Sequence, residues 1–78
     1  MFVILFITGD TWPKIYGVFK TKKDAHSSMI HMWEDHIIQL KAEGKKVESY
    51  DDFDGKIYGI KYVGEYQVCE IQNLKDSN

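Results

Sequence analysis

The stretch with the clearest chemical potential is YDDFDGKI, residues 50–57, where three aspartates precede a glycine as they do in calcium loops. In such an alignment Asp52, Asp54 and Gly55 fall on ligand and turn positions, but the first position is a tyrosine and the twelfth is Lys61. A loop with an ammonium in place of its bidentate carboxylate binds calcium poorly. Asp-Gly between two aromatic runs instead predicts a type I′ hairpin turn.

The same residues form an acidic surface, which is either a solvated turn or a contact for a basic partner. A second candidate contact is Trp12, in the loop after the first apolar run; it could also stack on a base or cover the core. The candidate protein-binding residues are therefore Trp12, Tyr50, Asp51, Asp52 and Asp54.

The polar residues of one helical segment suggest chemistry that their geometry does not support. Ser27, His31 and Asp35 lie in a row four residues apart, but on the polar face and without an oxyanion-hole turn, so no catalysis is expected. His26, His31 and His36 are five residues apart, which scatters the rings around the helix and predicts no metal site. His26 and His36 fall on the apolar face, where we expect half-buried rings with hydrogen-bond partners and possible pH sensitivity.

Lysines cluster where this helix should begin. Lys20, Lys22 and Lys23 near free N–H groups could bind a phosphate of a nucleotide or nucleic acid, although Asp24 competes for the same amides and such lysines are commonly a solvated edge. All ten basic residues are lysine. Without arginine, the chain lacks the guanidinium group that makes two hydrogen bonds to a guanine base, so sequence-specific DNA recognition is not expected.

The elements that must position these residues follow from periodicity and end signals. Thr21 is a good N-cap and Gly44 a good C′ residue, so they bound a helix over 22–43. Strands are predicted over 2–8, 14–19, 47–53, 56–63 and 66–74, with the last two turns at Asp54-Gly55 and Gly64-Glu65. The fold class is α+β in the order ββαβββ, an antiparallel sheet of four to five strands with one long amphipathic helix across one face. Residues 1–74 should form a single domain, and 75–78 a flexible tail.

Two mismatches follow from this arrangement. The helix should be about 33 Å long and the strands about 23 Å, so one helix end should overhang the sheet. One helix covers one face, yet the first strand is apolar on both, which would leave either Phe2, Ile4 and Phe6 or Val3, Leu5 and Ile7 wet. We therefore expect a homodimer or a protein partner to cover the second face.

Composition sets the remaining limits. The chain has 78 residues, 44% of them hydrophobic, and a net charge of −2, which is typical of one small globular domain. Its single cysteine, Cys69, excludes an internal disulfide, suits a reducing compartment and is expected to be a buried strand residue. The apolar start MFVILFI lacks the basic region and cleavage site of a signal peptide, so we expect a cytoplasmic protein without a cofactor or membrane contact.

The segment IYGVFKTKKDAH, within residues 14–33, resembles the hairpin–helix junction of small ββαββ domains of unknown function from bacteria and phages. It is also similar to the junction of plant ethylene-response-type DNA-binding domains, whose DNA-reading arginines are missing here. In size and style the chain resembles phage proteins that block host machinery, including anti-CRISPR proteins. From its surface residues we predict a non-catalytic protein-binding module, and the resemblance in size and style implies an inhibitor of a host defence protein that acts in the host cytoplasm. The alternative is binding of a nucleotide or nucleic-acid phosphate at Lys20, Lys22 and Lys23.

Overall fold

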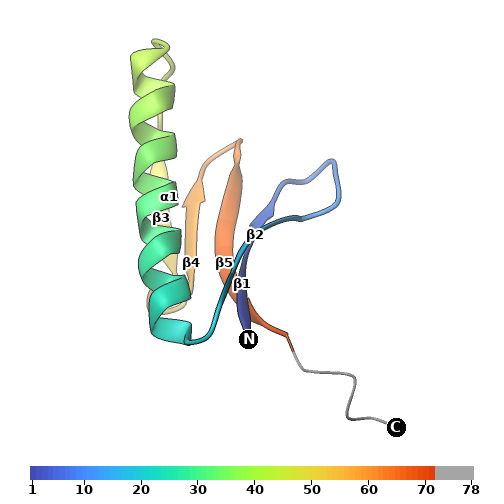
Figure 1. Cartoon of the computed structure of the whole chain (residues 1–78). Helices are drawn as coiled ribbons and strands as arrows, with labels where there is room; N and C mark the ends of the chain where they lie inside the picture. Colours follow the sequence, from blue (N-terminus) through green and yellow to red (C-terminus); the bar gives the residue numbers. More distant parts are fainter. Residues whose placement is uncertain (72–78) are drawn as a thin grey trace, which may run out of the picture.

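The computed structural model describes residues 1–71. One α-helix accompanies an antiparallel sheet of five strands in the spatial order β2-β1-β5-β4-β3 (Figure 1). The elements are β1 (Phe2–Ile7), β2 (Lys14–Phe19), α1 (Lys22–Ala42), β3 (Ser49–Asp52), β4 (Ile57–Ile60) and β5 (Gly64–Glu70). The α+β class and the order ββαβββ are thus confirmed. The end predicted for the last strand, the domain boundary at 74 and the tail lie outside the described residues.

The capping residues predicted at the two ends of the helix are confirmed. The Thr21 hydroxyl accepts the Asp24 backbone N–H at 3.1 Å, which satisfies one of the free donors of the first turn. At the other end Gly44 has φ 81°, a left-handed conformation that glycine adopts without steric cost. The last turns of α1 extend beyond the strands (Figure 1), as the length mismatch predicts. No helix among the described residues is long and apolar enough to cross a membrane.

The core lies between α1 and the middle of the sheet. α1 packs against β1, β2, β4 and β5. Met29 of α1 is fully buried and forms one cluster with Ile4 and Phe6 of β1 and Tyr66 of β5. These strand residues therefore define the helix-facing side of the sheet, and the residues that alternate with them define its outer side.

The outer side is less exposed than expected, so the prediction of three wet side chains in β1 is wrong. Val3 is only 2% exposed, and Leu5 and Ile7 are half-buried. Val3 lies opposite Cys69 of β5 on one side and the bulge of β2 on the other.

The turn predicted at Gly64-Glu65 is also displaced. The chain reverses over residues 61–63, where the Val63 N–H donates to the Ile60 carbonyl oxygen at 2.9 Å, and Gly64 already belongs to β5. A Cβ at Gly64 would lie 2.6 Å from the Phe6 ring. Glycine is present here because the ring approaches the backbone closely, not because the chain turns.

The Asp54-Gly55 turn is present and larger than a two-residue hairpin. Asp54 and Gly55 have φ 56° and 82°, and the Lys56 N–H donates to the Phe53 carbonyl oxygen at 3.2 Å, as in a type I′ turn. Strand pairing nevertheless ends at Asp52 and Ile57, and Phe53 also has a positive φ of 52°. The loop therefore spans residues 53–56.

Candidate protein-binding surface

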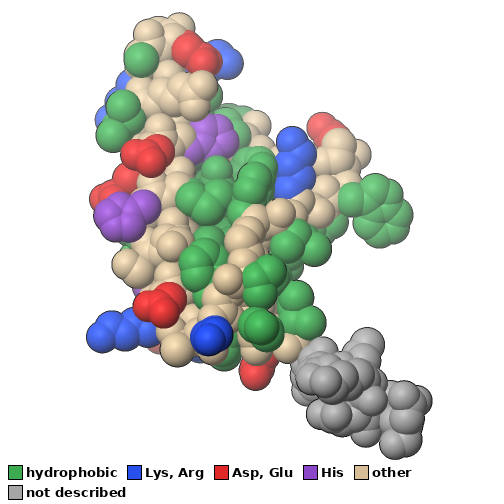
Figure 2. Space-filling model, in the orientation of Figure 1, with side chains coloured by type: hydrophobic (Ala, Val, Ile, Leu, Met, Phe, Trp, Pro, Cys, Tyr) green, Lys and Arg blue, Asp and Glu red, His purple; other side chains and the backbone are tan. Residues whose placement is uncertain are grey.

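Three strongly exposed apolar side chains lie on the hairpin of β1 and β2, whereas Tyr62 (95% exposed) and Phe53 (64%) lie singly in the two turns that flank β4. Ile15 and Val18 of β2 are 64% and 65% exposed, and Trp12 in the connecting loop is 90% exposed. Figure 2 shows hydrophobic side chains gathered over this part of the molecule and extending out along the hairpin loop. We call Trp12, Ile15 and Val18 the hairpin surface.

A bulge brings the two strand residues of the hairpin surface to the same side. Phe2 pairs with Phe19 and Ile4 with Tyr16, so two residues of β2, Gly17 and Val18, lie opposite one residue of β1. Gly17 has φ 69°, the left-handed conformation of the first residue in a glycine bulge. Because of the extra residue, Ile15 and Val18 both lie on the outer side although they are three positions apart.

Positive charge flanks this edge. Lys14 begins β2, and Lys20, Lys22 and Lys23 follow its end. Between residues 10 and 24 these four lysines oppose Asp10 and Asp24, so the segment carries +2 while the whole chain carries −2. The two ion pairs found within residues 1–71, Lys45–Glu43 and Lys61–Glu48, lie elsewhere. The edge of β2 is therefore apolar in the middle and basic at both ends.

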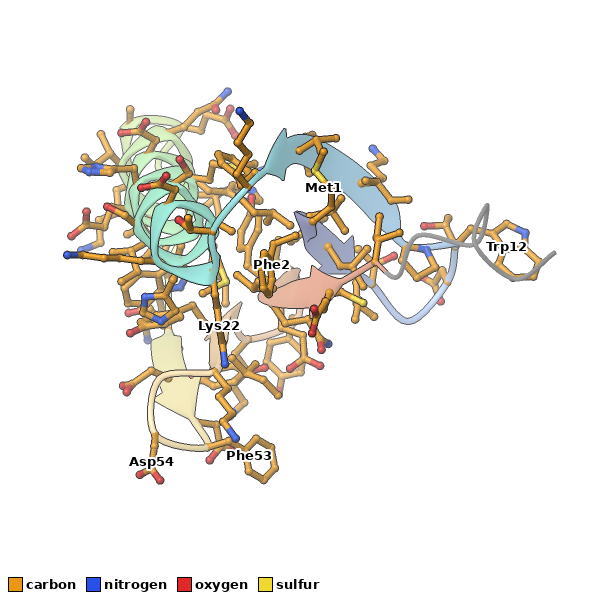
Figure 3. All side chains as sticks on the ribbon, turned by 60° about the horizontal axis from the view of Figure 1, so that its bottom comes forward. Met1, Phe2, Trp12, Lys22, Phe53 and Asp54 are labelled. Atoms are coloured by element: carbon orange, nitrogen blue, oxygen red, sulfur yellow. The ribbon has the colours of Figure 1, made fainter. Side chains whose placement is uncertain are left out.

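The acidic surface lies at the other edge of the sheet, on and after β3. Tyr50, Asp51, Asp52 and Asp54 are exposed. Trp12 lies far from Phe53 and Asp54 (Figure 3). The structure thus does not bring the candidate binding residues together into one surface.

Two members of the acidic surface have structural roles. The Tyr50 ring lies over Gly59, where a Cβ would meet it, and its hydroxyl donates to Glu65 Oε2 at 3.2 Å. Partial burial, followed by the Glu65 carboxylate, raises the pKa of the Tyr50 hydroxyl. Asp52 Oδ1 accepts the Phe53 N–H at 2.9 Å, which stabilises the left-handed start of the turn.

Three side chains of α1 form directed hydrogen bonds with the β4–β5 half of the molecule. His26 Nε2–H donates to the Gly55 carbonyl oxygen (2.8 Å), Trp33 Nε1–H donates to the Gly59 carbonyl oxygen (2.9 Å), and His36 Nδ1 bonds the Tyr66 hydroxyl (2.8 Å). His26 and His36 are half-buried and hydrogen-bonded, as expected, and their pH sensitivity stays a prediction. Burial, and then the nearby Tyr16, raises the pKa of the Tyr66 hydroxyl.

The other polar residues of α1 do not form a recognisable centre. Ser27, His31 and Asp35 are all exposed. No group of three metal-ligating side chains occurs in residues 1–71. Cys69 was expected to be buried, and this expectation is wrong: it lies near the end of β5, where its thiol is exposed.

The candidate anion site is only partly assembled. Lys22 lines a hollow together with His26, Lys56 and Asp54, whereas Lys20 and Lys23 are not part of its lining. Figure 3 shows Lys22 extending from the start of α1 toward the 53–56 loop. A phosphate here would meet two ammonium groups and also the Asp54 carboxylate, and the Thr21 hydroxyl already occupies the Asp24 N–H.

No protein-family model matches the sequence, and no curated protein or solved structure matches it either.

Proposed function

We propose that the chain is a non-catalytic protein-binding module that contacts its partner through the hairpin surface. The observation that carries the proposal is the exposure of Trp12, Ile15 and Val18 on a single hairpin. Isolated apolar side chains on a surface are ordinary, but a group that includes a tryptophan is typical of a binding surface. Covering them removes apolar area from water, which favours association.

The proposal takes α1 as covering one face of the sheet, so that the partner approaches from the outer side and the β2 edge. The partner is another protein or a second copy of the chain. The resemblance of the whole chain, in size and style, to small phage proteins that block host machinery favours an inhibitor that binds a host protein in the host cytoplasm.

Capture from a bacterial lysate, combined with sedimentation of the purified chain, tests the proposal. The variant carries Ile15→Lys and Val18→Lys. The control is Ile38→Lys, because Ile38 is also 65% exposed but lies on α1. We expect the control to retain the captured protein or the dimer and the double variant to lose it. Equal retention by both variants would refute the hairpin surface.

Phosphate binding by a nucleotide or nucleic acid is the alternative, and the shared lining of Lys22 and Lys56 favours it. This function predicts an affinity that falls steeply with salt and is lost in Lys22→Glu. Lys46→Glu, an exposed lysine away from this hollow, is the control. Recovery of nucleotide without protein would favour this alternative over protein binding.

A further inference from the structure

We propose that the partner contributes an extended segment with an apolar centre and acidic ends, which pairs with β2 as a sixth strand. This inference rests on the proposed function and specifies how the partner binds. Within residues 1–71, β2 pairs only with β1, so its other edge leaves backbone N–H and C=O groups without strand partners. Such an edge accepts a strand by main-chain hydrogen bonds, while pockets for alternate side chains provide specificity.

Both sides of β2 offer contacts to the side chains of an added strand. On the outer side lie Ile15 and Val18. On the helix-facing side, a groove between β2 and α1 is lined by Tyr16, Met32, Asp35, His36, Gln39 and Tyr66. Tyr16 is 38% exposed there. A strand beside β2 would place alternate side chains next to Ile15 and Val18 and over this groove.

The positive charge at both ends of β2 indicates which kind of segment would bind there. Lys14 lies opposite Phe6, and Lys20 directly follows Phe19, which lies opposite Phe2. With the bulge, the two lysines are about five ladder positions apart, or about 17 Å, and on opposite sides of the sheet. A segment of about seven residues with an acid at each end brings a carboxylate within reach of both long, flexible side chains. A second copy fits less well. Two β2 strands paired about a two-fold axis run antiparallel, which brings Lys14 of one copy near Lys20 of the other. Like charges at both ends of the contact oppose this dimer.

The test uses two capped heptapeptides, DVTVTVD and KVTVTVK, added to the isotope-labelled full chain. Amide chemical shifts and hydrogen exchange are measured by NMR at low salt. We expect DVTVTVD to shift and protect amides of residues 14–19 and to bind at least about ten-fold more tightly than KVTVTVK. Methylation of the backbone nitrogens of DVTVTVD should weaken its binding at least about ten-fold, because it removes main-chain donors.

Reversing the charge of the two lysines in the protein complements the comparison of the two peptides. Lys14→Glu with Lys20→Glu should invert the preference between the peptides, and Lys41→Glu with Lys46→Glu should leave it unchanged. The inference is overturned if DVTVTVD does not bind at millimolar concentration, or if both peptides bind equally well. It is also overturned if the chemical-shift changes are centred outside residues 14–19, or if the methylated peptide binds as tightly as DVTVTVD. A dimer that Ile15→Lys with Val18→Lys abolishes would overturn it in favour of a second copy.

Failure of this inference remains separable from failure of the proposed function. If a partner captured by the chain is lost in the double lysine variant but DVTVTVD does not bind, the hairpin surface stands and strand addition is refuted. If the double lysine variant retains the partner, the proposed function itself fails.

Discussion

The two edges of the sheet differ in the features that usually prevent a strand from pairing with another chain. β3 has four residues, two of them aspartates, and its Tyr50 ring lies back over Gly59 onto Glu65. β2 has six residues, with Ile15 and Val18 exposed and only the bulge at Gly17 to interrupt it. Short length and charge are common protections of sheet edges. β3 has both protections, whereas β2 is longer and apolar in its middle and is protected only by its bulge and by the lysines at its ends, which is consistent with an edge that stays open to an acidic partner.

The two halves of the sheet are also joined to α1 differently. Among the described side-chain hydrogen bonds, those from α1 reach Gly55, Gly59 and Tyr66, which belong to β4, β5 and the turn before β4. The β1–β2 hairpin packs against α1 through apolar side chains such as Phe6 and Phe19. The half of the sheet that ends at β3 is therefore attached to α1 by directed hydrogen bonds. The β1–β2 half is attached to α1 by apolar packing.

The largest effect on stability is expected from removing the bulge that shapes the open edge. Gly17→Val places a β-branched residue at φ 69° and its Cβ 2.7 Å from the Phe19 ring. We expect the free energy of unfolding to fall by about 2–3 kcal/mol, measured by urea denaturation. Gly9→Ala is the control, because a Cβ there meets nothing within 4 Å, and it should change stability by less than about 0.5 kcal/mol. Equal effects would show that the bulge is not required.

A smaller loss is expected from weakening the bonded half. Trp33→Phe leaves the Gly59 carbonyl oxygen without its side-chain donor and should reduce the free energy of unfolding by about 1–2 kcal/mol. Hydrogen exchange should show the loss mainly in amides of β4. An increase in exchange confined to β2 would contradict the contrast between the two halves.

The protection of the β3 edge can be tested at Gly59. In Gly59→Ala the new methyl group must displace the Tyr50 ring, whose far end is free to move, so we expect a stability loss below about 1 kcal/mol. Loss of its partial burial and separation from Glu65 should also lower the pKa of Tyr50 toward its ordinary value. Tyrosinate absorbance against pH checks this, with Tyr50→Phe to identify the signal. An unchanged titration would mean that the ring does not leave Glu65.

The smallest expected effect concerns pH. Because the pKa of Tyr66 is raised above its ordinary value of 10.0, the folded state holds this proton more tightly than the unfolded state. The resulting stabilisation is complete below pH 10 and is lost as pH rises through the folded pKa. Tyr66→Phe should therefore reduce the dependence of stability on alkaline pH, as measured by urea unfolding at about pH 9 and about pH 11. A steeper dependence in the variant would contradict the shift.

Features encoded by neighbouring residues could be predicted from the sequence. The helix limits at Thr21 and Gly44 and the turn at Asp54-Gly55 are of this kind, since capping and positive φ depend on local residue types. Strand order was not predictable, because it depends on contacts between distant segments. The sequence therefore did not indicate that β2 is an edge strand or that Ile15 and Val18 are exposed. The role of Gly64 likewise depends on Phe6, which lies far away in the chain.

For the candidate binding residues too, features set by neighbouring residues were predictable and contacts between distant segments were not. Trp12 could be proposed from its position in a loop, and the two half-buried histidines from helical periodicity. The sequence did not indicate that Tyr50 lies over Gly59 toward Glu65, because that contact requires the pairing of β3, β4 and β5. The glycine inside the pattern of β2 was the one available signal of a bulge at an edge.

The most direct test of the account compares capture of a partner by the wild-type chain and two double variants, one for each edge. The account predicts that Ile15→Lys with Val18→Lys abolishes capture, whereas Asp51→Asn with Asp52→Asn preserves it, while both variants stay within about 0.5–1 kcal/mol of wild-type stability. Loss of capture by the asparagine variant, with full capture by the lysine variant, would contradict the account and assign the binding surface to β3.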